Sequence, residues 1–143
     1  MNKQVRKRQD GFTLIEVMVV IVILGIMAAL VVPNLVGRQD QAQVTAARSD
    51  IAAIGNALDL YRLDNNTYPS TEQGLEALIE KPSGFPEPRN WRSPYLRKKL
   101  PDDPWGNPYQ YLSTDRGFEL FSYGADGQEG GEGTSADIRF EDV

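Results

Sequence analysis

A chain of 143 residues has room for about one domain of ordinary size, which excludes a large multidomain enzyme. It contains no cysteine and no histidine, so disulfides, thiolate nucleophiles, the usual zinc sites and mechanisms with a histidine base are excluded. The 20 acidic and 15 basic residues give a net charge of -5, which argues against a surface that follows nucleic acid phosphates. Catalysis and nucleic-acid binding are therefore poor first hypotheses.

The N-terminal stretch combines a basic leader with a long apolar run. Residues 1–10 carry four lysine or arginine side chains and one aspartate, and residues 11–32 are apolar except for Thr13 and Glu16. This run has the roughly 20 residues that a helix needs to cross a lipid bilayer. The basic flank predicts that the N-terminus stays in the cytoplasm and that the chain after Pro33 lies on the far side of the membrane.

A cleaved secretory signal peptide is the alternative interpretation of the apolar run. Such a peptide would need a shorter apolar stretch, followed by small residues at alternate positions before the cleavage point. Residues 27–30 read MAAL, with adjacent alanines, and the run continues beyond them. A retained transmembrane helix over residues 12–33 is therefore favoured.

Glu16 needs a physical reason, because an ionised carboxylate in the hydrocarbon region costs about 3 kcal/mol even on lenient insertion scales. We therefore expect it to have a cationic partner. An interfacial position with pairing to Arg8 in the leader is one alternative. Acidic residues inside membranes are functional by default, so a functional role for Glu16 is favoured.

Residues 11–16 read GFTLIE, which resembles the processing signature of type IV prepilins and of type II secretion pseudopilins. The resemblance implies that a prepilin peptidase cuts between Gly11 and Phe12 and methylates the new N-terminal Phe12. It also implies that Glu16 attracts the amino terminus of a neighbouring subunit, which would supply the missing cation. Residues 1–11 would be a cleaved leader, and residues 12–33 would serve as a transmembrane helix and as part of a fibre core.

After Pro33 the sequence becomes polar but keeps a helical period. Apolar residues recur at intervals of three and four, as they do on one face of a helix. A cluster of polar residues, Asp64–Asn66, predicts the end of this helix. We predict one helix over residues 12–63 whose second half packs an apolar stripe onto the rest of the domain. The members of this stripe are Val44, Ala47, Ile51, Ile54, Leu58 and Tyr61.

The next segment is rich in proline, and eight of the nine prolines lie between residues 68 and 108. Because proline interrupts helices and sheets, this segment cannot form long regular elements. A short helix is predicted over residues 71–80, with Ser70 or Thr71 as its N-cap. The aromatic residues expected to pin the remaining loop are Trp91, Tyr95 and Trp105.

The C-terminal part shows strand patterns. Residues 110–113 and 118–123 alternate around a turn at residues 114–117, which predicts a β-hairpin, and residues 138–140 can add a third strand. A sheet of this size needs a helix to cover one face, and the apolar stripe can do so. The predicted fold class is α+β, a long N-terminal helix packed on a small antiparallel sheet, as the resemblance to pilins also implies.

Two further runs narrow the resemblance. Residues 61–78 (YRLDNNTYPSTEQGLEAL) and residues 103–111 (DPWGNPYQY) are similar to the major pseudopilins of type II secretion, the G subunit family. Type IV pilus subunits typically close their C-terminal loop with a disulfide, which a chain without cysteine cannot form. The narrower resemblance therefore favours a pseudopilin.

A glycine-rich acidic loop lies near the C-terminus, and five of the ten residues 124–133 are glycine. A flexible acidic loop is the simplest interpretation. Calcium, however, binds mixtures of carboxylate and carbonyl oxygens, and the resemblance implies a structural calcium ion here with Asp126 as its main carboxylate ligand. The other ligands that the resemblance implies are the carbonyl of Tyr123 and oxygens of Thr134, Ser135 and Asp137.

The resemblance implies a structural subunit without catalytic activity, which polymerises from the bacterial inner membrane into a periplasmic fibre that helps export folded proteins. Residues 34–143 would form its periplasmic domain. Implied partners are further copies of the chain, the prepilin peptidase, minor pseudopilins and the inner-membrane assembly platform, but no nucleic acid. A type IV pilus subunit for adhesion, motility or DNA uptake is one alternative. A membrane-tethered hydrolase using Asp102 and Asp103 is another, although adjacent acids in a loop make a poor acid and base pair.

Overall fold

The computed structural model describes residues 11–92, 94–97 and 99–143, without the side chains of residues 31–36. The chain divides into two compact units, Met1–Arg38 and Gln39–Val143. Of the predicted leader, residues 1–11, the structure describes only Gly11, and the rest lies outside the described residues.

The first element is the helix α1, Leu14–Asn65, which has 52 residues. The sequence predicted a helix over residues 12–63, so the helix has the expected length but begins and ends two residues later. At its end Asn66 has a left-handed backbone with φ of 63°, and its N–H donates to the Arg62 carbonyl at 2.7 Å. This geometry is a helix C-cap, and it confirms the stop predicted from the cluster Asp64–Asn66.

The predicted membrane-spanning segment, residues 12–33, includes residues 31–33, whose side chains lie outside the description. Within the described part of the chain, no helix is both long enough and apolar enough to cross a membrane.

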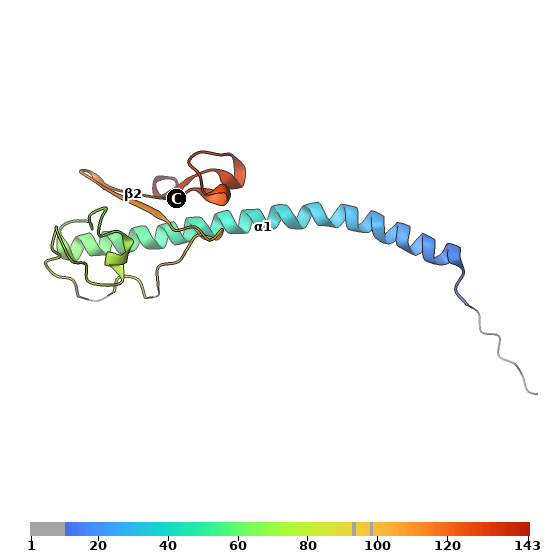
Figure 1. Ribbon diagram of the computed structural model, residues 1–143, viewed down its shortest axis with the longest axis horizontal. Coiled ribbons are helices and arrows are strands. Elements are labelled where there is room, and N and C mark those ends of the chain that lie inside the picture. The colour runs from blue at the N-terminus through green and yellow to red at the C-terminus, as the bar shows by residue number, and fades with distance from the viewer. Residues whose placement is uncertain (1–10, 93, 98) are drawn as a thin grey trace, which may run out of the picture. The chain divides into compact units, whose positions relative to one another are not determined.

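In the second unit, the predicted apolar stripe of α1 forms one side of the hydrophobic core. Its members from Ala47 to Tyr61 are at most 1% exposed, and Val44 packs against them partly buried. The strands contribute Tyr111, Leu120 and other side chains to the same cluster. Figure 1 shows the sheet beside this part of α1. The structure therefore confirms that the stripe packs on the sheet.

The sheet has three antiparallel strands in the order β1-β2-β3. Thr114 pairs with Gly117 at the end of the predicted hairpin, and Ser122 pairs with Ile138 at the other edge. The α+β fold and the hairpin are confirmed, and the third strand is one residue shorter than predicted. The strands are β1 (Gln110–Thr114), β2 (Gly117–Ser122) and β3 (Ile138–Arg139). The C-terminal segment also contains the 3-10 helices η2 (Gly124–Asp126), η3 (Gly133–Ser135) and η4 (Phe140–Asp142).

The short helix predicted over residues 71–80 is present only in part, as a 3-10 helix in the later part of the segment. A turn occupies the first part of this segment, and the 3-10 helix η1, Leu75–Leu78, follows it. Gly74 has a φ of 60°, a left-handed conformation that an α-helix cannot contain. Ser70 caps the turn as expected, because its hydroxyl accepts the Gln73 N–H at 3.2 Å and the Gln73 side chain accepts the Ser70 N–H at 3.0 Å.

The loop between η1 and the sheet is pinned by aromatic side chains, as the sequence predicted. Trp91 donates its indole N–H to a carbonyl of η1 at 2.9 Å. The Tyr95 ring lies 5.4 Å from the Tyr61 ring, and its hydroxyl accepts from the Asn65 side chain at 3.2 Å. Trp105 is also partly buried against the core. Trp91 therefore holds the loop against η1, and Tyr95 holds it against the C-terminal end of α1.

Candidate functional site

The predicted processing site lies before the start of α1. Gly11 and Phe12 belong to no helix or strand, and the Phe12 side chain is 86% exposed. A Cβ built on Gly11 would meet no described atom within 4 Å, apart from those of its neighbours in the chain. The packing of the described residues therefore does not require glycine at this position.

Glu16 lies in the exposed first turn of α1. Its N–H donates to the carbonyl of Thr13 at 3.1 Å and to the Thr13 hydroxyl at 3.4 Å, so Thr13 is the N-cap of the helix. The spacing of Thr13 and Glu16 is that of a capping box, a signal for the helix start that the sequence reasoning missed. The alternative pairing of Glu16 with Arg8 lies outside the described residues.

Large apolar side chains cover the N-terminal part of α1. Between Phe12 and Met27 they are exposed by 46% to 86%. A helix that is apolar all round is normally buried, in lipid or against other helices. This segment therefore needs a cover that the chain's own described residues do not supply.

The predicted calcium ligands lie on two segments of one loop, residues 123–126 and 134–137. The two segments touch at Gly124, where a Cβ would lie 2.8 Å from the carbonyl oxygens of both Thr134 and Ala136. Gly124 also has a φ of 72°, which favours glycine. The structure thus brings the backbones of the two segments together and turns main-chain oxygens of the second toward the first.

The two predicted carboxylate ligands bind backbone N–H groups of the same loop. Asp126 is exposed, and its Oδ1 accepts the Gln128 N–H at 3.1 Å. The Asp137 side chain is 12% exposed, and it accepts the Gly130 N–H at 3.1 Å and pairs with Arg139 at 3.4 Å. Because an ionised carboxylate has about four acceptor positions, both side chains keep acceptor capacity for a further ligand.

This donor set contains only oxygen, as calcium prefers. In the part of the chain that the structure describes, no group of three or more acidic, histidine or cysteine side chains is placed to hold a metal ion. A calcium ion in this loop would therefore take most of its six to eight oxygens from main-chain carbonyls and hydroxyls. The segments that meet at Gly124 offer such oxygens. The residues of this loop therefore fit a calcium ion that is bound mainly by main-chain carbonyls and hydroxyls.

A buried carboxylate lies next to this loop, and the sequence pattern suggested a role for it only as half of an acid pair. Asp103 is 4% exposed, whereas Asp102 is exposed. Asp103 Oδ1 accepts the N–H groups of Trp105 at 3.1 Å and Asn107 at 2.8 Å, and Oδ2 accepts the Ser122 hydroxyl at 2.6 Å. Asp102 and Asp103 therefore differ in burial, and these hydrogen bonds indicate a structural role for Asp103.

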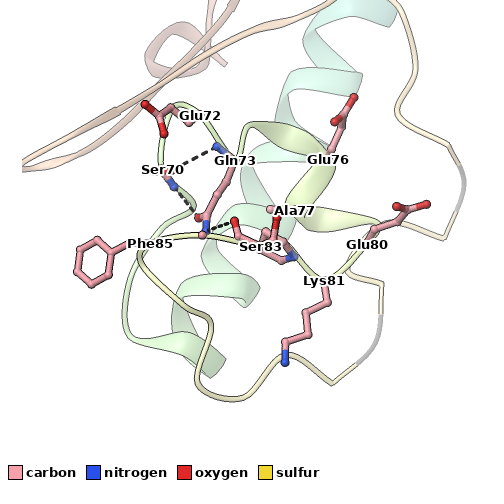
Figure 2. Close-up of a pocket in the computed structure, with 11 residues that line it drawn as sticks. Ser70, Glu72, Gln73, Glu76, Ala77, Glu80, Lys81, Ser83 and Phe85 are labelled. Carbon is pink, nitrogen blue, oxygen red and sulfur yellow. Dashed lines mark hydrogen bonds between the residues drawn. The ribbon is translucent and has the colours of Figure 1, made fainter.

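A polar cavity of about 300 Å³ lies elsewhere in the second unit, among residues 70–85 (Figure 2). The Gln73 side chain lies within it and donates to the carbonyls of Ser83 at 3.4 Å and Pro86 at 3.0 Å. Figure 2 shows the acidic side chains pointing in different directions, with Glu72 on the same side of the view as the Phe85 ring and Glu76 and Glu80 on the other. These groups do not converge on a common ligand. The acidic side chains are Glu72, Glu76 and Glu80.

A long N-terminal helix whose C-terminal part packs on a small antiparallel sheet is the arrangement of type IV pilin-like subunits. The sequence profile described as "Prokaryotic N-terminal methylation motif" matches residues 6–32. The profile described as "Type II secretion system (T2SS), protein G" matches residues 34–141. The chain belongs to the type II secretion system protein G family.

Known relatives agree with this assignment. The chain is 63% identical over 135 residues to the type II secretion system core protein G of Pseudomonas aeruginosa, covering 93% of this chain and 95% of the relative. It is 62% identical over 138 residues to the core protein G of Vibrio cholerae, covering 95% of this chain and 93% of the relative.

A solved structure is similar as well. The major pseudopilin from the type 2 secretion system of enterohaemorrhagic Escherichia coli shares 49% sequence identity and superposes with a TM-score of 0.62. The match covers 76% of this chain and 95% of that chain. These relatives support the pseudopilin interpretation over the type IV pilus alternative.

Proposed function

We propose that this chain is the major structural subunit of a type II secretion pseudopilus. It polymerises from the bacterial inner membrane into a periplasmic fibre that helps drive folded proteins across the outer membrane, and its role is structural and not catalytic. The observation that carries the proposal is the methylation motif at residues 6–32, which includes the start of a helix with exposed apolar side chains. Lipid would cover this surface before assembly, and neighbouring copies would cover it in the fibre.

The proposal includes cleavage between Gly11 and Phe12 by a prepilin peptidase, followed by methylation of Phe12. Two observations support it. The bond lies in non-helical backbone ahead of α1, and the glycine is not demanded by packing among the described residues, so recognition by a processing enzyme explains it. After cleavage, residues 12–33 remain as the single membrane anchor, and residues 34–143 lie in the periplasm.

Cleavage also creates a new cation, the amino group of Phe12. Glu16 lies in the first turn of α1, close behind this terminus in the sequence, and we propose that its carboxylate pairs with the amino terminus of a neighbouring copy. The attraction between the two charges is strong in a medium of low dielectric, where an unpaired carboxylate would be costly. Minor pseudopilins and the inner-membrane assembly platform are the other proposed partners.

We also propose one structural calcium ion in the loop 123–137, with Asp126 as its main carboxylate ligand. The support is the contact at Gly124, which brings main-chain oxygens of the two loop segments together. When bound, the ion supplies a positive charge that joins the two segments. The further ligands proposed are the Tyr123 carbonyl and oxygens of Thr134, Ser135 and Asp137.

The proposal is tested by the intact mass of the protein from membranes of cells with and without a prepilin peptidase. We expect a chain that begins at Phe12 and carries one additional methyl group, only when the peptidase is present. A chain that begins at Met1 in both samples would contradict the assignment of the processing site. Gly11→Leu should block cleavage, whereas Gly25→Ala, also at a glycine with open space among the described atoms, should leave it unchanged.

A further inference from the structure

We propose that Asp103 and Ser122 are positioning residues that hold the calcium loop, residues 123–137, in its binding geometry. This inference rests on the calcium ion proposed above. Asp103 begins the turn of residues 103–107, and Ser122 is the last residue of β2, directly before the loop. Neither residue is among the ligands that the family resemblance implies.

The first link between Asp103 and the calcium loop is the buried hydroxyl of Ser122. Ser122 is fully buried, and its hydroxyl donates to Asp103 Oδ2 at 2.6 Å and accepts the Gly124 N–H at 3.1 Å. A hydrogen bond of this length to an ionised oxygen is charge-assisted and stronger than a neutral one. It therefore fixes the hydroxyl, and the hydroxyl in turn fixes the first residue of η2.

The second link lies at the other end of η2. The Asn107 side chain lies 3.4 Å from a Cβ built on Gly127, which is the residue that follows Asp126. Asn107 is itself held by Asp103, whose Oδ1 accepts its N–H at 2.8 Å. Asp103 is thus connected to both sides of Asp126, the proposed main ligand. It is connected to Gly124 through the Ser122 hydroxyl, and to Gly127 through Asn107.

The charge of Asp103 has a further effect. Its described hydrogen-bond partners are neutral donors, and the described residues place no lysine or arginine in an ion pair with it. A buried carboxylate without a cation is costly, so a positive ion nearby is favourable. Asp103 is separated from Gly124 by only the Ser122 hydroxyl, so its negative charge favours a cation in the loop.

The test is a calorimetric titration of calcium chloride into the full-length chain in detergent micelles. Ser122→Ala removes the hydroxyl link, and Asp103→Asn keeps the side-chain shape but removes the charge. Because partners of metal ligands typically contribute about 10-fold to 100-fold to metal affinity, we expect each variant to weaken calcium binding by about that factor. Thr71→Ala is the matched control, since the Thr71 hydroxyl also accepts a backbone N–H. That N–H belongs to Ser113, at 3.0 Å, in β1 on the opposite edge of the sheet from β3.

The outcomes separate the two proposals. If the unaltered chain binds no calcium, the calcium proposal fails, and this inference fails with it. If the unaltered chain binds calcium and Asp126→Ala does not, but Ser122→Ala and Asp103→Asn keep full affinity, only the positioning role is overturned. A lower melting temperature in calcium-free buffer with unchanged affinity would likewise overturn the positioning role alone. Should Ser122→Ala not fold, Asp103→Asn and Asn107→Ala decide the matter.

Discussion

Gly55 sets how closely the C-terminal segment packs on α1. A Cβ built on this glycine would overlap the ring of Phe140, which is partly buried against the core. Glycine inside a helix costs roughly 0.5 to 1 kcal/mol relative to alanine, so its presence needs a reason. The close approach of the Phe140 ring supplies that reason.

We therefore expect Gly55→Ala to lower the free energy of unfolding by about 1 to 2 kcal/mol. Overpacking a core typically costs about 1 to 3 kcal/mol, and the better helix propensity of alanine offsets only part of this. Urea unfolding of the full-length chain measures the change. Gly25→Ala in the same helix has open space among the described atoms and is the control. A Gly55→Ala chain as stable as the unaltered one would show that the ring moves aside without cost.

Single residues also show where sequence patterns are insufficient. The sequence shows that Asp102 and Asp103 are adjacent, but it does not show which of them is buried. Burial depends on Ser122, 19 positions away along the chain, whose hydroxyl reaches Asp103 only after β2 has formed. In contrast, the cap formed by Thr13 and Glu16 is local, and its spacing could have placed the helix start correctly.

At the scale of elements, two tyrosine hydroxyls join the chain around β1 to distant segments. Tyr109 donates to Asp50 of α1 at 3.0 Å, and Tyr111 donates to the carbonyl of Pro69 at 2.7 Å. Burial raises the pKa of both tyrosines well above the ordinary value of 10.0, and the Asp50 carboxylate raises that of Tyr109 further. Both hydroxyls therefore hold their protons more tightly in the folded chain than in the unfolded chain.

This difference predicts a loss of stability in alkali. A raised pKa in the folded state gives stability that is complete below pH 10 and is lost above it, because the unfolded tyrosine ionises first. The unfolding free energy of the unaltered chain should decrease with pH above about pH 10. Tyr109→Phe and Tyr111→Phe should each make this decrease less steep, by about 1.4 kcal/mol per pH unit. Chemical unfolding at a series of pH values measures the slopes. An equally steep slope in the double variant would contradict the prediction.

The elements also differ in how well local patterns predict them. The apolar period of α1 and the alternation of β1 and β2 are local and repeated, so these elements were predicted within two residues. The segment 71–80 carried a good N-cap at Ser70, but a cap also closes a turn, and Gly74 then directs the backbone out of the α conformation. The candidate calcium loop depends on contacts between its two segments, which glycine content alone does not specify.

At the scale of the whole molecule, calcium binding should appear as thermal stability. A ligand that binds only the folded state stabilises it by about 2.7 kcal/mol at 100 times its dissociation constant. We expect Asp126→Ala to lower the melting temperature in calcium and to abolish the shift between calcium and chelator. Glu129→Ala, an exposed acid in the same loop and not a proposed ligand, should keep the shift. An unchanged shift in Asp126→Ala would remove this residue from the site.

Assembly should depend on the charge of Glu16 and not on its size. Glu16→Gln leaves the backbone N–H bound to Thr13 and removes only the carboxylate charge, so α1 should still form. We expect cleavage at Gly11 to continue and fibre formation to fall by more than tenfold. Chemical cross-linking of subunits in membranes, with Glu72→Gln as a surface control, measures this. Normal fibres from Glu16→Gln would exclude the proposed pairing with a neighbouring amino terminus.

The hydrophobic core of the second unit takes its members from Val44 onward, and among the described residues none comes from the first unit. On the proposed function, transfer of residues 12–33 from lipid into a fibre would therefore remove no member of this core. These residues would exchange lipid for neighbouring copies while the domain that follows keeps its own core.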